Sequence, residues 1–99
     1  EIIDTIEALP AEQLNTDLIG QLARAYNNVE NYAKGLELLK TIEFEEGHSL
    51  IWNWRAGYSY FFLDDFVNAE KCFLKAYELD PDDEDVCNFL VGVYLSLAS

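Results

Sequence analysis

The sequence predicts an all-α protein built from antiparallel helix pairs. Apolar residues recur at helical spacing in several successive segments, and no segment shows the sustained alternation of a β-strand. The links between the segments are only a few residues long, which forces neighbouring helices to run antiparallel. The 99 residues are enough for one domain with a modest core.

The first half of the chain is expected to form three helices. Residues 2–9 carry apolar side chains at helical spacing, and Pro10 ends that run. Asn15 or Thr16 can cap a second helix, which ends near residues 27–28, because a short side-chain oxygen accepts a hydrogen bond from the free amides of a first turn. A third helix starts near Asn31 and closes before Gly47.

The second half is expected to form three more helices. Ser49 caps a fourth helix that runs to about Leu63. Asp64 and Asp65 then break the chain and favour the start of a fifth helix over residues 66–79. A sixth helix begins in the acidic turn at residues 80–83 and runs to the end of the sequence.

The helical pattern repeats with a period of 34 residues. Tyr26, Tyr60 and Tyr94 are spaced by this period, and two residues separate each of them from a preceding pair of apolar or small residues. The same shift relates four further pairs of positions, namely Gly35 and Ala69, Leu39 and Phe73, Ile42 and Ala76, and Gly47 and Pro81. A period of this length indicates a repeated helix–turn–helix unit.

The repeated pattern resembles the tetratricopeptide repeat. Residues 50–83 match its signature best, with Ala56, Gly57 and Tyr60, then Ala69 and Phe73, and finally Pro81. The resemblance implies a short right-handed solenoid, a single domain over residues 1–99. Its units would be 16–49 and 50–83, preceded by the second helix of a degenerate unit plus a linker (1–15) and followed by the first helix of a further or capping unit (84–99).

Two packing expectations come with this resemblance. Gly57, Ala69 and Ala76 would be the small residues where the two helices of a unit cross, with large residues in the holes beside them. Asn53 occupies the tryptophan position of the family, so we expect the neighbouring Trp52 to fill that packing site.

Composition excludes several classes of function. The formal net charge of −13 argues against nucleic acid and anionic membrane surfaces as partners. No apolar run approaches the roughly 20 residues that cross a bilayer. Cys72 and Cys87 lack CxxC spacing and predict a reducing, cytoplasmic setting.

The sequence shows no pattern of catalytic, metal-binding or cofactor-binding residues. His48 is a lone histidine in a polar turn and is interpreted as an exposed loop residue. The acidic run at 80–85 fails the calcium-loop pattern, because Asp85 stands where glycine is needed and Val91 where glutamate is needed. We therefore expect no enzyme, no metal and no cofactor.

A possible binding surface lies opposite the packing stripe of the first helices. In the family, these helices line a concave groove that holds a peptide or a partner helix. The aromatic part of this face could also be covered by neighbouring helices. The same helix already has a packing stripe for the core, so a second apolar face favours partner binding or contact between copies of the chain. The expected groove residues are Arg24, Asn27, Asn28, Ile51, Trp54, Arg55, Tyr58, Phe61, Phe62, Asn88 and Phe89.

The expected partner is a protein or peptide, basic or apolar in character. Some members of the family hold acidic chaperone tails with a clamp of lysine, asparagine and arginine. Gly20 and Phe89 occupy groove positions where such polar groups would help, and the net charge is −13, so acidic-tail recognition is not expected.

The predicted function is a non-catalytic protein-interaction module with a concave, partly aromatic groove. The alternatives are a structural or oligomerisation unit of a larger repeat protein and a regulatory domain attached to an enzyme. The last expected helix is apolar nearly all round, so we expect it to be covered in one of two ways. Residues beyond 99 would supply a second helix, or two copies would form a homodimer through residues Val86, Leu90, Val93, Tyr94 and Leu97.

Overall fold

The computed structural model describes residues 15–98, and within them every regular element is a helix. Their order is α2 (Thr16–Asn28), α3 (Tyr32–Thr41), α4 (Glu43–Glu46), α5 (Leu50–Phe62), α6 (Phe66–Leu79) and α7 (Glu84–Ala98). The all-α prediction is confirmed. The expected helix at residues 2–9 lies outside the described residues.

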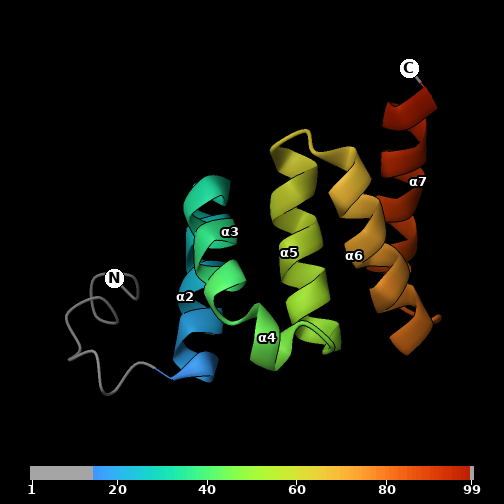
Figure 1. The fold of residues 1–99 in the computed structure, drawn as a ribbon. Helices are drawn as coiled ribbons and strands as arrows, with labels where there is room; N and C mark the ends of the chain where they lie inside the picture. Colours follow the sequence, from blue (N-terminus) through green and yellow to red (C-terminus); the bar gives the residue numbers. More distant parts are fainter. Residues whose placement is uncertain (1–14, 99) are drawn as a thin grey trace.

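The helices are arranged as a stack with α2 at one end and α7 at the other (Figure 1). Helix α2 packs on α3 and α5 on α6, while α3 packs on α5 and α6 on α7. The described chain is elongated, with extents of 44 × 24 × 20 Å. Adjacent helices in the chain are therefore neighbours in space, as short links require.

Side-chain caps begin four of the helices at the residues that the sequence indicates. The side chains of Asn15, Asn31, Ser49 and Asp65 each accept a hydrogen bond from a backbone amide three residues later. Such a bond satisfies one of the amides that have no partner within the helix. Polar residues between apolar runs thus set where α2, α3, α5 and α6 start.

The 34-residue period is visible in the backbone of two turns. Glu30 and Asp64, 34 positions apart, both have a φ of 64°. The residue after each, Asn31 or Asp65, donates its backbone N–H to the carbonyl of Tyr26 or Tyr60 over 2.9 Å. The turn between α2 and α3 therefore has the same backbone conformation as the turn between α5 and α6.

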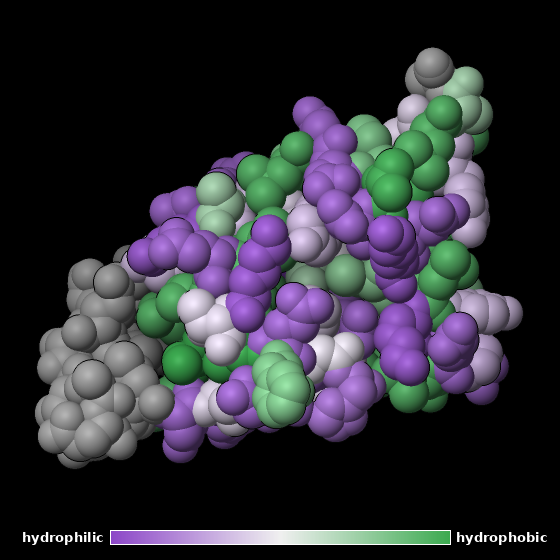
Figure 2. Space-filling view, in the orientation of Figure 1, coloured by the Kyte–Doolittle hydropathy of each residue, from purple (hydrophilic) through white to green (hydrophobic). Residues whose placement is uncertain are grey.

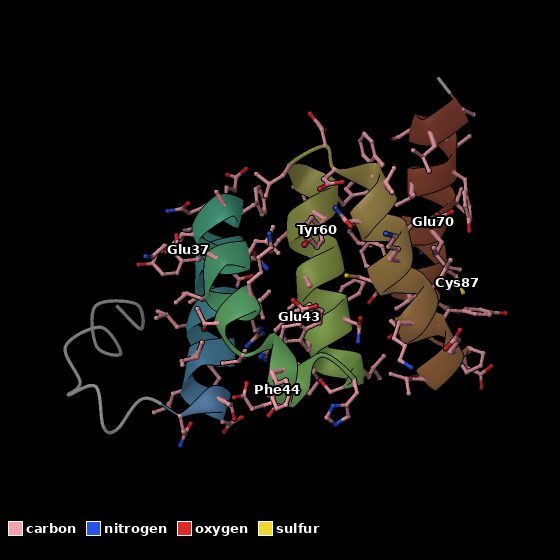
Figure 3. The ribbon with its side chains drawn as sticks, in the orientation of Figure 1. Glu37, Glu43, Phe44, Tyr60, Glu70 and Cys87 are labelled. Carbon is pink, nitrogen blue, oxygen red and sulfur yellow. The ribbon has the colours of Figure 1, made fainter. Side chains whose placement is uncertain are left out.

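The third expected helix is shorter than predicted. Helix α3 ends at Thr41, and the single turn α4 follows after Ile42. The hydroxyl of Thr41 donates to the carbonyl of Leu38 over 2.6 Å, and the Ile42 amide bonds to the nearer Leu39 carbonyl. These local bonds tighten the last turn and end the regular helix. The phenyl of Phe44 projects from α4 into solvent (Figure 3).

Two apolar clusters form the core. One lies between the two helix pairs and includes Leu36, Leu39 and Trp52, and the other joins α6 to α7 around Phe73. The Trp52 indole N–H donates to the carbonyl of Leu39 over 2.9 Å, so this large side chain is buried with its polar atom satisfied. Leu63, which directly follows α5, is exposed.

Gly57 lies at a close contact inside the second helix pair. A Cβ added there would approach three atoms of the Phe73 ring to 2.8, 2.9 and 3.0 Å. Phe73, Ala69 and Ala76 are completely buried beside it. The expected close crossing is present, and the group that approaches the glycine is an aromatic ring.

Candidate functional site

Helices α2 and α5 face each other across a hollow of about 280 Å³. Its lining comes from one face of each helix and consists of Arg24, Asn27, Asn28, Ile51, Trp54, Arg55 and Tyr58. All seven are among the residues expected to form a groove. The structure thus brings together side chains that lie up to 34 positions apart in the sequence.

A second hollow of about 380 Å³ adjoins the first near the N-terminal end of α2. Ile51 and Arg55 contribute to both hollows, so the two share a wall. Asp17 and Gly20 of α2, with Glu46 and Ser49 from the region of α4, line the second one. Sequence reasoning missed this extension, because the break after α3 that places Glu46 there was not foreseen.

The lining combines exposed and half-buried side chains. Ile51 is 59% exposed, and Arg24 and Asn28 are exposed beside it. Trp54, Arg55 and Tyr58 are half-buried, so each presents part of its surface to the hollow. Such a mixture of apolar surface with a few polar groups is typical of a binding cleft.

Asn27 has a structural part in the hollow, contrary to its expected role as a free groove residue. It is buried, its amide Nδ2 donates to the Arg55 carbonyl over 3.4 Å, and its Oδ1 accepts from the Ser59 hydroxyl over 2.8 Å. A Cβ on Gly35 would lie 2.6 Å from that Oδ1. Asn27 therefore joins α2, α3 and α5 and sets the spacing of the walls.

The aromatic residues on the expected groove face of α5 (Trp54, Tyr58, Phe61 and Phe62, called the aromatic stripe below) lie partly at the hollow and partly against the core. The ring centroid of Phe61 lies 5.2 Å from that of Phe89 on α7, and both rings pack on the second core cluster. The rings of Trp54 and Phe73 are 5.7 Å apart. Phe61 and Phe89, which were expected in the groove, are half-buried against each other and do not line the hollow.

At the other end of the stripe, the exposed ring of Phe62 stacks on Tyr32 of α3 with centroids 4.9 Å apart. Tyr32 also lies 6.0 Å from Tyr58, which lines the hollow. Sequence reasoning missed Tyr32 because it considered only the first helix of each unit. The 34-residue period contained the signal, since Tyr32 corresponds to Phe66, whose ring also contacts an aromatic ring of α5, meeting Phe61 edge to face with centroids 5.5 Å apart.

The expected self-association residues separate into two groups. Val86, Leu90 and Val93 are buried against α6 in the second core cluster, so assigning them to an intermolecular surface was wrong. They face α6 because they recur at helical spacing on the side where Ala69 and Ala76 allow close approach. Tyr94 and Leu97 are 46% exposed and remain on the surface, and Asn88 is exposed away from the hollow.

The electrostatics of the hollow depend on its two arginines. Burial, and then the charge of Arg24, lower the pKa of Arg55, while Asp17 raises it. Between residues 15 and 98 there is no group of three or more side chains that could hold a metal ion. Nor does that part of the chain contain a helix long and apolar enough to cross a membrane.

Comparison with known proteins identifies the repeat. Residues 53–83, from α5 to the turn after α6, match the family model of the tetratricopeptide repeat. The chain carries a tetratricopeptide repeat. Tetratricopeptide repeats generally mediate protein–protein interaction and are typically non-catalytic. A search of curated proteins finds no match to the chain.

Proposed function

We propose that this tetratricopeptide-repeat protein binds a peptide or a helix of a partner protein in the hollow between α2 and α5. The observation that carries the proposal is the convergence of seven side chains from two helices on one concave site. The exposed Ile51 and the half-buried Trp54 and Tyr58 supply apolar contact area, and the arginines supply polar contacts.

The site has the size and shape of a contact for a short segment. The two adjoining hollows have volumes of about 280 and 380 Å³. Together they follow α5 from Tyr58 back to Leu50, a path that an extended peptide of a few residues or one turn of helix would cover. Shape and apolar contact would supply most of the binding free energy.

We propose that the rest of the chain is organised in units of the same repeat. Residues 16–49 and 50–83 would be two units, 84–99 the first helix of a further or capping unit, and 1–15 the end of a preceding one. Cys72 and Cys87 are free thiols, which supports a cytoplasmic setting for such a module.

The proposal is tested with two matched variants. Peptides that bind the chain are selected from a random display library, and one of them is titrated against Ile51→Lys and Val67→Lys. Both positions are similarly exposed in the first turns of α5 and α6, at 59% and 54%, but only Ile51 lines the hollow. We expect Ile51→Lys alone to weaken binding. Equal effects of the two substitutions would contradict the site.

A second candidate function, self-association, is supported by the outer face of α7. Residues 86–98 contain no charged side chain, although the whole chain has a net charge of −13. Val91 is 58% exposed on this helix, and hydrophobic side chains gather at this end of the molecule (Figure 2). Two copies would meet with least charge repulsion and bury most apolar surface here.

Tyr94 marks the edge of this face. Burial and a hydrogen bond with Glu70 of α6 raise the pKa of its hydroxyl, and Glu70 lies on α6 beside α7 (Figure 3).

Sedimentation over a hundredfold concentration range tests self-association. A dimer that Val91→Lys dissociates and Val67→Lys does not would support it, whereas a monomer at every concentration would contradict it.

A further inference from the structure

The outer face of α7 lies at one end of the stack (Figure 1). The inner face of this helix packs on α6 through Val86, Leu90 and Val93, which are buried. On the outer face, Val91 and Leu95 lie one helical turn apart, and each is more than half exposed. Apolar side chains gathered on one exposed face of a helix indicate a contact with another segment or molecule.

The 34-residue period shows how the position of Val91 is covered elsewhere in the chain. It corresponds to Gly57 on α5 and to Ala23 on α2, and both of those residues are buried. A Cβ on Gly57 would lie 2.8 Å from the Phe73 ring of α6. A Cβ on Gly35 of α3 would lie 3.0 Å from the carbonyl oxygen of Ala23. In each unit, the second helix therefore crosses close to the first at this position.

Val91 excludes the same arrangement on α7. A second helix placed on α7 as α6 lies on α5 would leave too little space for even a Cβ, and valine also has two methyl groups. A β-branched side chain is restricted at χ1, so it cannot turn away from the crossing without strain. The helix that covers Val91 must therefore lie farther from α7, as helices with large side chains at their contact do.

Charge indicates that a second copy of the chain covers this face. The chain has a net charge of −13, so two copies repel each other over most of their surface. Residues 86–98 contain no charged side chain, so this face does not attract a basic partner in preference to the acidic surface elsewhere. A second copy presents the same uncharged apolar face, and two-fold symmetry allows identical surfaces to match.

The acidic run before α7 determines how the two helices are oriented. Five acidic residues lie at positions 80 and 82–85, directly before α7 and in its first turn. Parallel packing would place the runs of both copies side by side. Antiparallel packing places them at opposite ends of the pair, about 20 Å apart, whereas charges are screened beyond about 8 Å at physiological ionic strength. Repulsion therefore favours the antiparallel pair.

We infer that α7 packs antiparallel on α7 of a second copy, an inference that rests on the self-association proposed above. Val91 of each copy lies opposite Leu95 of the other, so the two most exposed large apolar side chains of α7 are buried together. A single helix pair buries less than the roughly 800 Å² per copy of a typical stable interface. The dimer is therefore weak, with a Kd on the order of micromolar or above.

Disulfide crosslinking in a mixture of two chains tests the orientation. One chain carries Val91→Cys and the other, with a longer tag, carries Leu95→Cys; both carry Cys87→Ser, and Cys72 is buried. Equal amounts are oxidised at a concentration where sedimentation shows the dimer. Antiparallel packing predicts that the crosslink between the two different chains exceeds both crosslinks between identical chains several-fold. Val67→Cys, exposed on α6, replaces Val91→Cys in the control mixture and should give no mixed crosslink.

The native Cys87 provides a second measurement without any substitution. In the antiparallel pair, the two Cys87 residues are about 18 Å apart along the helices, too far for a disulfide, so the parent chain should not crosslink. Crosslinks between identical chains, or through Cys87, would overturn the orientation and leave self-association standing. A dimer with no crosslink through α7 would overturn the inference and place the contact elsewhere. A monomer at every concentration would refute self-association itself.

Discussion

Replacement of Gly57 by alanine should destabilise the fold, although alanine is the better helix former. The added Cβ would lie 2.8–3.0 Å from three atoms of the Phe73 ring. That ring is completely buried and is held between Trp54 and Phe89, with centroid distances of 5.7 and 5.3 Å. Moving this ring away from the new methyl group would therefore disturb the two neighbouring rings.

The magnitude follows from two opposing effects. Inserting a methyl group into a well-packed core costs about 1–3 kcal/mol, and removing a glycine from a helix interior returns about 1 kcal/mol. The difference is a net loss of up to about 2 kcal/mol. Because the methyl group meets three atoms of a completely buried ring, we expect Gly57→Ala in the upper half of this range, about 1–2 kcal/mol or roughly 4–16 °C in Tm. Gly57→Leu, with a much larger side chain at the same contact, should cost more than 3 kcal/mol.

Gly92→Ala is the matched control on α7. A Cβ there would lie 3.3 Å from two atoms of the Phe61 ring. Because this ring is only half-buried, we expect it to make the small shift that the methyl group requires. The helix preference of alanine should then dominate, so this variant should be as stable as the parent or about 0.5–1 kcal/mol more stable. The two glycine-to-alanine changes are predicted to have opposite signs.

Urea unfolding followed by circular dichroism at 222 nm measures both variants. A double-mutant cycle with Phe73→Leu locates the clash. In that background the shorter side chain leaves space for the methyl group, so Gly57→Ala should lose most of its cost or become stabilising. The reasoning is refuted if Gly57→Ala matches or exceeds the stability of the parent chain.

Three further predictions follow from the described contacts. Asn27→Ala should lower the unfolding free energy by about 1–3 kcal/mol, as measured in urea, since it removes a buried partner of Ser59; an unchanged midpoint would contradict its role at the junction. Glu30→Gly should raise Tm, whereas Glu30→Gln should not, because a φ of 64° strains a side chain. Burial, and then Glu43 and Asp65, raise the pKa of Cys72 to about 12, so its thiol stays neutral at pH 8. Iodoacetamide at this pH should therefore label Cys87 before Cys72. Equal labelling of the two thiols in the folded protein would contradict the burial of Cys72.

The raised pKa of Cys72 also predicts a dependence of stability on alkaline pH. An unfolded thiol ionises near pH 8.5–9, whereas the folded thiol resists ionisation up to about 12. Stability from this group is complete below the unfolded pKa and falls as pH rises through this window. Cys72→Ser should flatten the decline in Tm between pH 9 and 11, and an unchanged slope would indicate that other groups cause it.

Local patterns in the sequence predicted the start of four helices and the repeat that relates them. Asn15, Asn31, Ser49 and Asp65 cap their helices through short-range bonds that depend on a few neighbouring residues. The 34-residue period then placed one face of α2 beside one face of α5. This is why seven expected groove residues line a common hollow.

Contacts between distant parts of the chain determine the side-chain directions and burial that local sequence patterns did not predict. The direction of the Arg55 side chain depends on Gly20, which lies 35 positions earlier in the chain. The burial of Asn27 depends on Ser59, and that of Phe61 on the position of α7. On α7, apolar residues occur nearly all round the helix, so only the contact with α6 distinguishes the buried Val86 from the exposed Val91. These outcomes require the relative placement of helices.

A titration followed by nuclear magnetic resonance tests the central claim, that the α2–α5 hollow is the binding site. The isotopically labelled chain is titrated with a peptide selected from a display library, and backbone amide shifts are mapped. The account predicts saturable shifts at Arg24, Asn28, Ile51 and Tyr58, with little change at Val67 on α6. Shifts confined to α6 or to the outer face of α7, with none between α2 and α5, would contradict it.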